Sequence, residues 1–306
     1  MKAFIIKRML LFFPVVFGVL TLVFLLIHLI PGDPVDLMLG ENALAIDKEK
    51  LRESLRLNET LAVQYMLFIK GVIKGDLGES LHNKEPVIHM ILKRYPETIK
   101  LTIAAMTLAL LISLPIGIYS AVKQYSFMDN CSMFFALLGV SMPNFWLGPL
   151  LMILFCVNLG WFPISGDEGL RSIVLPAVTL GTAMSAILSR MVRSSMLEVI
   201  NEEYIVTARA KGLSELRVIF RHALKNALVP IITVIGLQFG ALLAGAIITE
   251  TIFSWPGIGR LLIQAINTRD YPLVQGCVLA ISISYVLINI ITDIAYSYID
   301  PRIKLN

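Results

Sequence analysis

Long stretches without Asp, Glu, Lys or Arg constrain the fold of this sequence more than any other feature. Six such stretches occur, and they are 18 to 37 residues long. A helix needs about 20 apolar residues to cross the hydrocarbon core of a bilayer, because each residue adds about 1.5 Å along the helix axis. The sequence therefore predicts an all-α integral membrane protein. The stretches are 9–32, 101–122, 130–166, 172–189, 226–249 and 271–292.

The composition and the missing motifs argue against a soluble protein and against a self-contained enzyme. Only 16% of the residues are charged and 57% are hydrophobic, whereas a soluble domain carries about 25% charged residues and disorder requires low hydrophobicity. The sequence contains no Gly-Lys dipeptide, hence no phosphate-binding loop, and it contains neither H-E-x-x-H nor G-x-S-x-G. Its three cysteines and four histidines are scattered. We therefore expect no catalytic residue, no metal site and no cofactor on this chain.

The positions of Lys and Arg predict six spans with both termini in the cytoplasm. Basic residues concentrate in cytoplasmic loops when these are short. Lys2, Lys7 and Arg8 precede the first span, and seven basic residues lie between the fourth and fifth spans. The predicted spans are 9–30, 101–122, 131–159, 172–189, 226–249 and 271–292. In this topology residues 1–8, 190–225 and 293–306 lie in the cytoplasm, and residues 31–100 and 250–270 lie outside.

The third charge-free stretch is too long for one span and short for two spans with a turn. Trp161-Phe162-Pro163 near its end is typical of an aromatic anchor at the membrane interface followed by a helix breaker. We therefore expect one helix over 131–159, and a re-entrant pair of helices is the alternative.

The external segment 31–100 predicts a small cap that packs on the membrane face. Asn58 is placed to cap a helix in which apolar residues recur at spacings of three and four. Those residues, which would share one face, are Leu61, Tyr65, Phe68 and Val72. Contact with a transported solute is an alternative role for this cap.

The cytoplasmic segment 190–225 predicts a helix, a glycine turn and a second helix. The first helix covers 201–211 and stops at Gly212, because glycine adopts positive φ at a helix C-terminus without steric cost. Ser214 is positioned to cap the second helix. The small side chains of Ala208 and Ala210 would let this segment sit closely in a protein groove. Contact with anionic lipid and docking of a partner protein are both open on this pattern alone.

Several motifs, in order along the chain, resemble those of the dipeptide/oligopeptide/nickel family of ABC importer permeases. The stretch from Tyr204 to Ser214, followed by 222–227 and Pro230, resembles the coupling-helix motif of that family. Val206-Thr207-Ala208 stands where the broader importer motif begins with Glu-Ala-Ala, as in the variant typical of this subfamily. The resemblance covers nearly the whole chain. The other matching stretches are 28–34, 64–65, 75–78, 141–146, 250–260 and 269–272.

The resemblance implies a type I ABC importer permease fold and a multi-pass location in the cytoplasmic (inner) membrane. It implies a second, related permease chain, two ATPase subunits or a homodimer that carry ATP and Mg, and an external solute-binding protein, but no nucleic acid. The solute would be a small peptide, with a nickel or other metal chelate as the alternative. The residues implied to dock an ATPase are Tyr204, Thr207, Ala208, Arg209, Ala210, Lys211, Gly212, Leu213 and Ser214.

Polar residues inside the predicted spans are candidates for lining a translocation path, because such residues are costly in a bilayer unless they pair or face a path. Ser141 and Asn144 lie in the third span, and Gln238 lies in the fifth. Pro143 frees a backbone carbonyl and is expected to bend the third span. Hydrogen bonding between helices is the alternative role for each polar residue.

Two further groups of residues lie in and just after the fifth predicted span. One group places small residues on one helical face, where a helix of this chain or of a second permease can approach closely. Its members are Gly236, Gly240 and Ala244. The other group is predicted to belong to an outer gate, although a salt bridge or a cap is the alternative for its acidic member. It consists of Glu250, Trp255, Pro256 and Gly257.

Transport driven by partner ATPases is the mechanism that these features favour. We expect alternating access, in which ATP binding moves the cytoplasmic segment and reopens the path toward the outside. An ion-coupled carrier usually holds ionisable side chains at mid-membrane, and no predicted span has an internal charged residue. A stand-alone carrier or channel is the less favoured alternative, and a membrane enzyme would need clustered ionisable groups within the spans.

Overall fold

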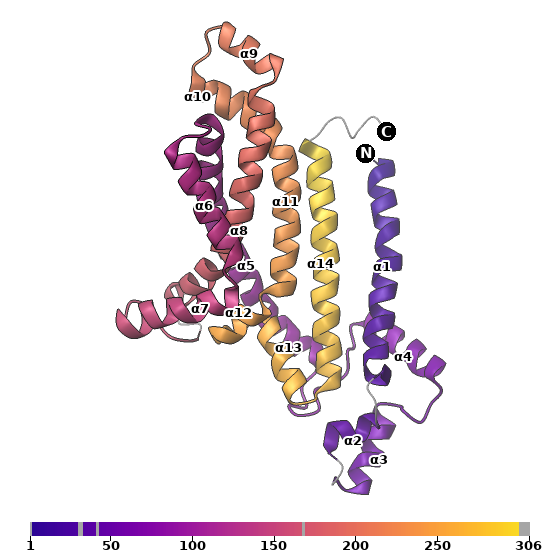
Figure 1. The fold of residues 1–306 in the computed structure, drawn as a ribbon. Helices are drawn as coiled ribbons and strands as arrows, with labels where there is room; N and C mark the ends of the chain where they lie inside the picture. The colour runs from indigo at the N-terminus through magenta and orange to yellow at the C-terminus, as the bar shows by residue number, and fades with distance from the viewer. Residues whose placement is uncertain (1, 30–32, 41–42, 167–168, 300–306) are drawn as a thin grey trace.

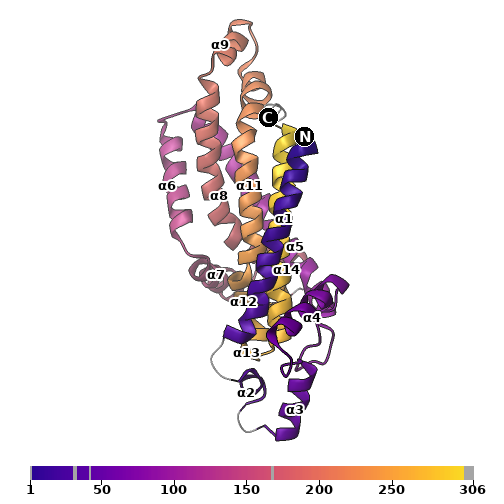
Figure 2. The same ribbon diagram turned by 90° about the vertical axis from the view of Figure 1, so that its right-hand side faces the viewer.

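The computed structural model describes residues 2–29, 33–40, 43–166 and 169–299. Within these ranges the regular structure is helical, and only an isolated antiparallel bridge joins Glu79 to Pro86. Five long helices run side by side and give the molecule its elongated shape (Figures 1 and 2). They are α1 (Lys2–Leu29), α5 (Val87–Val122), α8 (Leu170–Ile200), α11 (Leu224–Gly245) and α14 (Tyr271–Ile299).

Several of these helices are long and apolar enough to cross a membrane. Four segments meet that condition in the described residues, and a bent pair gives a fifth if its two parts form one span. The described apolar part of α1, Phe12–Leu25, is shorter than the four. The structure therefore agrees with a multi-pass membrane protein, and the count of six spans stays a prediction. The four segments are Val87–Val122, Leu170–Ile200, Glu215–Leu243 and Tyr271–Ala295.

The third predicted span is broken, which corrects the expectation of one helix over 131–159. α6 (Phe127–Ser141) and the following arm, which starts with α7 (Asn144–Met152), differ in direction by 99°. Met142 between them has φ −86° and ψ 115°, because the ring of Pro143 disfavours helical angles at the preceding residue. A π-helical turn, Ile153–Asn158, completes the arm. This is the geometry of a broken span or of the re-entrant pair left open by the sequence.

Two helices extend well beyond the charge-free stretches that predicted them. α5 begins after Pro86, although 87–100 was expected to belong to the external segment. α8 continues through 190–200, which was expected to be a cytoplasmic connection. A helix that has formed propagates through polar residues at little cost, so these turns continue past the apolar stretch. The segments at both ends of the molecule are therefore built directly on the long helices.

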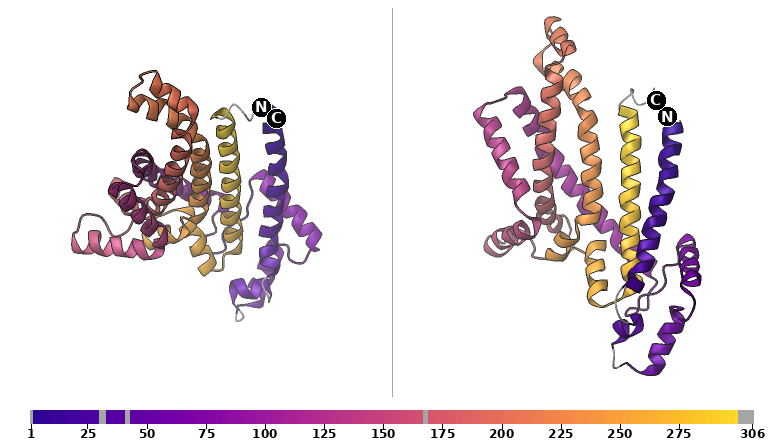
Figure 3. Two further views of the ribbon diagram at one scale, coloured as in Figure 1. Left: turned by 45° about the horizontal axis from the view of Figure 1, so that its top comes forward. Right: turned by 45° about the vertical axis from the view of Figure 1, so that its right-hand side comes forward.

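Short helices gather at the two ends of the molecule (Figures 1 and 3). One end carries α9, α10 and a π-helical turn, and the first turn of α1 and the last turn of α14 lie at that same end (Figure 1). Its short elements are α9 (Glu203–Ala210), α10 (Glu215–Arg217) and the turn Val218–Ala223. The short helices toward the other end are α2 (Pro34–Leu39), α3 (Ala45–Ser54), α4 (Leu61–Lys74), α12 (Ile247–Ile252) and α13 (Ile258–Asn267).

The main core lies where α5, α8 and α11 meet. Leu101, Leu188 and Leu242, one from each helix, are among its buried members. α5 and α8 approach closely because a Cβ added to Gly117 would lie 2.6 Å from the Cβ of Val192. These three helices therefore form one packed unit, on which the α9 end of the molecule is mounted.

Candidate functional site

The segment from α9 to the π-helical turn is anchored to the long helices by apolar packing. Ile205 of α9 is fully buried, and it belongs to the same cluster as Val192 of α8 and Ile231 of α11. Ile118 of α5 belongs to this cluster as well. A displacement of α9 would therefore act on three long helices at once, because close-packed interiors transmit strain. We call residues 203–223 the coupling segment.

α9 has a buried face and an exposed face, and the predicted docking residues divide between them. Ala208 is only 6% exposed and packs inward with Ile205. This differs from the expectation that Ala208 would itself enter a partner's groove. Leu213 is half-buried against the same cluster. The exposed residues are Tyr204, Thr207, Arg209, Ala210, Lys211, Gly212 and Ser214.

The turn after α9 forms as the sequence indicates. Gly212 has φ +76°, a conformation that favours glycine. Ser214 occupies the N-cap position of α10, although its side chain makes no capping hydrogen bond. Arg209 instead spans the turn, because its Nε donates to Oε1 of Glu215 at 2.9 Å. These contacts join α9 to α10 and leave the exposed face of α9 free for contact with another molecule.

Tyr204 connects α9 to the start of α11. Its hydroxyl oxygen accepts a hydrogen bond from Nδ2 of Asn226 at 2.6 Å. The side chain is 40% exposed, so it combines an internal contact with an accessible edge. Sequence reasoning placed Tyr204 in the docking set but gave no indication of this bond, which joins residues 22 positions apart.

A buried ion pair beside the coupling segment was missed by sequence reasoning. The side chain of Asp129 is 1% exposed, and its two oxygens accept hydrogen bonds from Nε and Nη2 of Arg193 at 2.8 and 2.9 Å. The backbone N–H of Tyr125 also donates to Asp129 at 2.9 Å. The bonds from Arg193 hold the pKa of Asp129, which lies outside the predicted spans, below its ordinary value. The pair fastens the α5–α6 connection to α8.

The polar residues expected to line a path lie at the bend of the third predicted span and in α11. Ser141 is exposed and donates within its own helix to the carbonyl oxygen of Leu137 at 2.8 Å. Pro143 is exposed and Asn144, the first residue of α7, is half-buried. These residues stand together at the 99° bend. Their role in a path stays a prediction.

Gln238 lies inside α11 and carries an unsatisfied donor. Its Nε2 atom is buried and makes no hydrogen bond to any residue that the structure describes. A buried amide donor without an acceptor lowers the stability of the fold by about 1–3 kcal/mol. A hydrogen-bond acceptor on a bound molecule would offset this cost. Gln238 therefore remains a candidate path residue. Among the described residues, no hydrogen bond joins it to Ser141 or Asn144.

The small residues of α11 face α14 of the same chain. A Cβ on Gly236 would lie 2.1 Å from Thr292, and one on Gly240 would lie 3.1 Å from the ring of Tyr285. Of the two alternatives left open, the structure therefore shows packing within the chain at these two positions. The side chain of Ala244 lies outside the described part of the structure.

The residues predicted as an outer gate form a buried hydrogen-bonded junction. Glu250 is fully buried, and its oxygens accept hydrogen bonds from Oγ1 of Thr98 at 2.6 Å and from the backbone N–H of Arg260 at 3.0 Å. Thr98 Oγ1 in turn accepts from the N–H of Ile258 at 2.9 Å. The carboxylate thus caps the first turn of α13. This arrangement matches the helix-cap alternative for Glu250.

Trp255 and Gly257 complete this junction. Trp255 is 3% exposed, and its indole N–H donates to the carbonyl oxygen of Glu97 on α5 at 2.9 Å. A Cβ on Gly257 would lie 2.2 Å from Oε1 of Glu250, so only glycine leaves room for the carboxylate. Pro256, half-buried, separates the two. The junction ties α5, α12 and α13 together, and a gating role for it stays a prediction.

A second buried carboxylate on this side, Asp270, was also missed by sequence reasoning. The residue is 1% exposed, and its Oδ2 accepts hydrogen bonds from the hydroxyl of Ser80 at 2.5 Å and from the N–H of Leu81 at 3.0 Å. Its Oδ1 accepts from the N–H of Leu273 at the start of α14. The loop 75–86 is thereby pinned to the α13–α14 turn.

Models of one transport family match most of this chain. The family described as "Binding-protein-dependent transport system inner membrane component" matches residues 113–305. The N-terminal region of such membrane components matches residues 1–102. Together the two matches extend over almost the whole sequence.

Curated relatives are similar over their full length. The dipeptide transport system permease protein of Alkalihalophilus pseudofirmus is 47% identical, over 99% of this chain and 100% of its own. The di/tripeptide transport system permease protein of Pseudomonas aeruginosa is 45% identical, over 99% of each chain. The glutathione transport system permease protein of Salmonella typhimurium is 42% identical, also over 99% of each chain.

Solved structures share the fold at low sequence identity. A chain of the methionine ABC transporter MetNI aligns with a TM-score of 0.56 and 19% identity, over 71% of this chain and 99% of that one. A chain of an amino acid ABC transporter aligns with a TM-score of 0.52 and 16% identity, over 70% and 94% of the two chains. The helical arrangement is thus one that ABC importers use.

Proposed function

This chain belongs to the family of binding-protein-dependent transport system inner membrane components, and on that basis we propose that it forms half of a membrane path that imports small peptides. It is a multi-pass permease subunit of an ABC importer in the inner membrane, and as such it is not an enzyme. The similarity to relatives named for dipeptides and di/tripeptides, over 99% of the chain, carries the proposal.

Small peptides are the proposed solute, ahead of the nickel chelate that was the alternative. The three relatives described above are named for dipeptide, di/tripeptide and glutathione transport. All three of these solutes are short peptides, so one solute class fits all three names. Gln238, with its unsatisfied amide donor, is suited to a solute that carries carbonyl and carboxylate oxygens.

The proposed partners follow from the same family membership. A second permease chain would complete the path, two ATPase subunits would bind ATP and Mg, and an external binding protein would deliver the peptide. The exposed face of α9, with Thr207, Ala210 and Lys211, is the proposed docking surface for one ATPase. It is supported by the position of α9 at the extremity of the molecule (Figure 1).

The proposed mechanism is alternating access transmitted through the coupling segment. Closure of the ATPases would displace α9, and the cluster around Ile205 would pass that displacement to α5, α8 and α11. The π-helical turn Val218–Ala223, which leads into α11, is the kind of local irregularity that is frequent at functional sites. After hydrolysis the path would face inward and release the peptide.

Uptake in cells tests the solute class. In a strain that lacks this gene and other peptide importers, expression of the chain with its partners should restore uptake of a radiolabelled dipeptide. Excess unlabelled dipeptide should compete, and a nickel chelate should not. Competition by the chelate alone would replace the proposal with the alternative.

Cysteine cross-linking tests the docking surface. Cys131, Cys156 and Cys277 are first replaced by serine. Ala210→Cys should then cross-link to an ATPase subunit in at least one nucleotide state, while Lys123→Cys, exposed on the α5–α6 connection, gives a lower yield. No cross-link at Ala210 in any nucleotide state would favour lipid contact for α9.

A further inference from the structure

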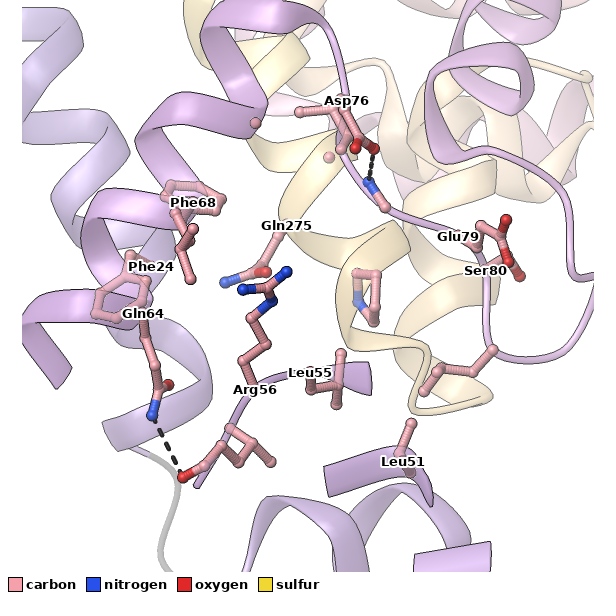
Figure 4. Close-up of a pocket in the computed structure, with 18 of the residues that line it drawn as sticks. Phe24, Leu51, Leu55, Arg56, Gln64, Phe68, Asp76, Glu79, Ser80 and Gln275 are labelled. Carbon is pink, nitrogen blue, oxygen red and sulfur yellow. Dashed lines mark hydrogen bonds between the residues drawn. The ribbon is translucent and has the colours of Figure 1, made fainter. Parts of the chain in front are cut away.

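A cavity of about 520 Å³ lies between the external helices and the long helices α1 and α14. Most of its wall is apolar, and side chains from four separate parts of the chain converge on it (Figure 4). Phe24 comes from α1, Phe68 from α4, Leu55 from the end of α3 and Leu279 from α14. None of the predicted path, docking or gate residues lines it, so it is a separate feature.

The depth of this cavity along α1 places it beside the bilayer. Phe24 belongs to the charge-free stretch 9–32, whose midpoint is near residue 20. At about 1.5 Å per residue, Phe24 lies roughly 6 Å from that midpoint, whereas half the hydrocarbon thickness is about 15 Å. Tyr65 and Phe68 of α4 stack on Phe24 with ring centroids 5.1 and 5.8 Å away. α4 therefore lies at the depth of the outer leaflet.

The side of α4 that faces away from α1 is apolar, as expected for a helix at the depth of the outer leaflet. Met66 is 64% exposed and Ile73 is 80% exposed. Together with Ala62 and Ile69 they form a stripe along the helix, at spacings of three and four residues. Lys70 and Lys74 flank this stripe and are exposed, as basic residues are at a membrane interface. This stripe continues the exposed apolar surface of α1, which includes Phe17 and Leu22.

The cavity also contains charged groups of both signs. The side chain of Arg56 is exposed and points toward Gln275 (Figure 4), and none of the ion pairs or side-chain hydrogen bonds among the described residues involves it. Lys84 lines the cavity as a second cation. The carboxylates are those of Asp76, which accepts from the N–H of Gly78 at 3.0 Å, and Glu79. An apolar wall beside a guanidinium that is accessible to a ligand suits a molecule with hydrocarbon chains and an anionic group.

We propose that α4 is inserted in the outer leaflet and that this cavity binds one phospholipid, with its phosphate at Arg56 and an acyl chain against Phe24 and Phe68. Asp76 and Glu79 suit an amine on the headgroup, so a phosphoethanolamine lipid matches the charges on both sides. The lipid holds the external segment against α1 and α14. This inference does not rest on the solute or on the docking surface.

The lateral position favours a lipid over a transported peptide. α1 and α4 lie on one side of the molecule, while α6 and the coupling segment lie on the other (Figure 1). The proposed path residues Ser141 and Asn144 belong to that other side. A ligand in the cavity would therefore lie on the side of the molecule opposite those two path residues.

Native mass spectrometry of the assembled transporter tests the site. The probes are dioleoylphosphatidylethanolamine and dioleoylglycerol, which has the same chains and no phosphate. Arg56→Gln should weaken the tightest phospholipid binding about tenfold, because a charge-assisted bond to phosphate is lost. The matched control Arg171→Gln, at an exposed arginine on α8, should leave binding unchanged. Equal affinity of the Arg56→Gln and parent proteins, or equal affinity for the two probes, would overturn the proposal.

A second measurement tests the depth of α4 in folded protein. In proteoliposomes, brominated acyl chains should quench the fluorescence of the Ile73→Trp protein. The quenching should exceed that of the parent protein, which contains only the native tryptophans. Glu53→Trp, exposed on α3, should not be quenched. Absence of quenching at Ile73→Trp would place α4 outside the bilayer and contradict the proposal, whatever the behaviour of Arg56→Gln.

Discussion

Three buried carboxylates, Asp129, Glu250 and Asp270, each join parts of the chain that are distant in sequence. Their partners Arg193, Thr98 and Ser80 lie 64, 152 and 190 residues away. A carboxylate that is buried without partners is strongly destabilising, so each of these loops is held in one arrangement. Nothing in the local sequence marks these pairings, because a side-chain contact over such separations is set by the packing of helices.

Loss of the Asp129 carboxylate is expected to destabilise the protein. Asp129→Asn leaves Arg193 without its bidentate partner, and breaking a buried pair costs about 3 kcal/mol, somewhat less here because Arg193 is 22% exposed. The melting temperature in detergent should fall by several degrees. Glu198→Gln, at an exposed carboxylate on α8, is the control and should not change it.

The pH dependence of this effect follows from the lowered pKa of Asp129. The pair stabilises the fold fully above the ordinary aspartate pKa of 3.8. This contribution is lost as the pH falls through the lower pKa of Asp129 in the folded state. The difference in melting temperature between parent and Asp129→Asn should be constant from about pH 8 to 5 and shrink below about pH 4. A constant difference at low pH would contradict the assignment.

A methyl group at position 257 is expected to disrupt the junction around Glu250. In Gly257→Ala the new Cβ would lie 2.2 Å from Oε1 of the carboxylate, and overpacking of this kind costs about 1–3 kcal/mol. The melting temperature and peptide uptake should both fall. Gly18→Ala is the matched control, because no atom lies within 4 Å of its Cβ position. An unchanged melting temperature in Gly257→Ala would show that the junction is not rigid.

At the scale of elements, the sequence predicted the long helices but not where they end. Charge-free stretches indicate where a helix crosses the bilayer, but they do not indicate where it ends. α5 and α8 continue through the polar residues 87–100 and 190–200. The sequence predicted a bend at Pro143 and left a re-entrant pair open, because the proline rule acts on one residue and does not give the 99° change of direction. The turn at Gly212 was predictable, since its conformation depends on glycine itself.

The two faces of α9 were not separable from the sequence, and a pair of substitutions tests them. Ala208→Glu places a charge in the buried cluster, so both the melting temperature and uptake should fall. Ala210→Glu changes only the exposed face, so uptake should fall at least fivefold while the melting temperature stays the same. Normal uptake in Ala210→Glu would reject the docking surface, and an unchanged melting temperature in Ala208→Glu would contradict the buried face.

At the scale of the whole molecule, the chain has two differently built ends. One end presents the coupling segment, which is mounted on the packed unit of α5, α8 and α11. The other end is held by the hydrogen bonds of Glu250 and Asp270 and carries α2, α3 and α4. We propose that force enters at the first end and that the path opens or closes at the second, so the chain itself supplies no energy.

Reconstitution into proteoliposomes shows whether the chain needs its partners to move a solute. Uptake of a radiolabelled dipeptide is measured with this chain alone and with its partner permease, ATPases and binding protein, each with and without ATP. We expect no uptake by the chain alone and ATP-dependent uptake by the complete assembly. Dipeptide uptake by the chain alone, at a rate independent of ATP, would contradict this expectation.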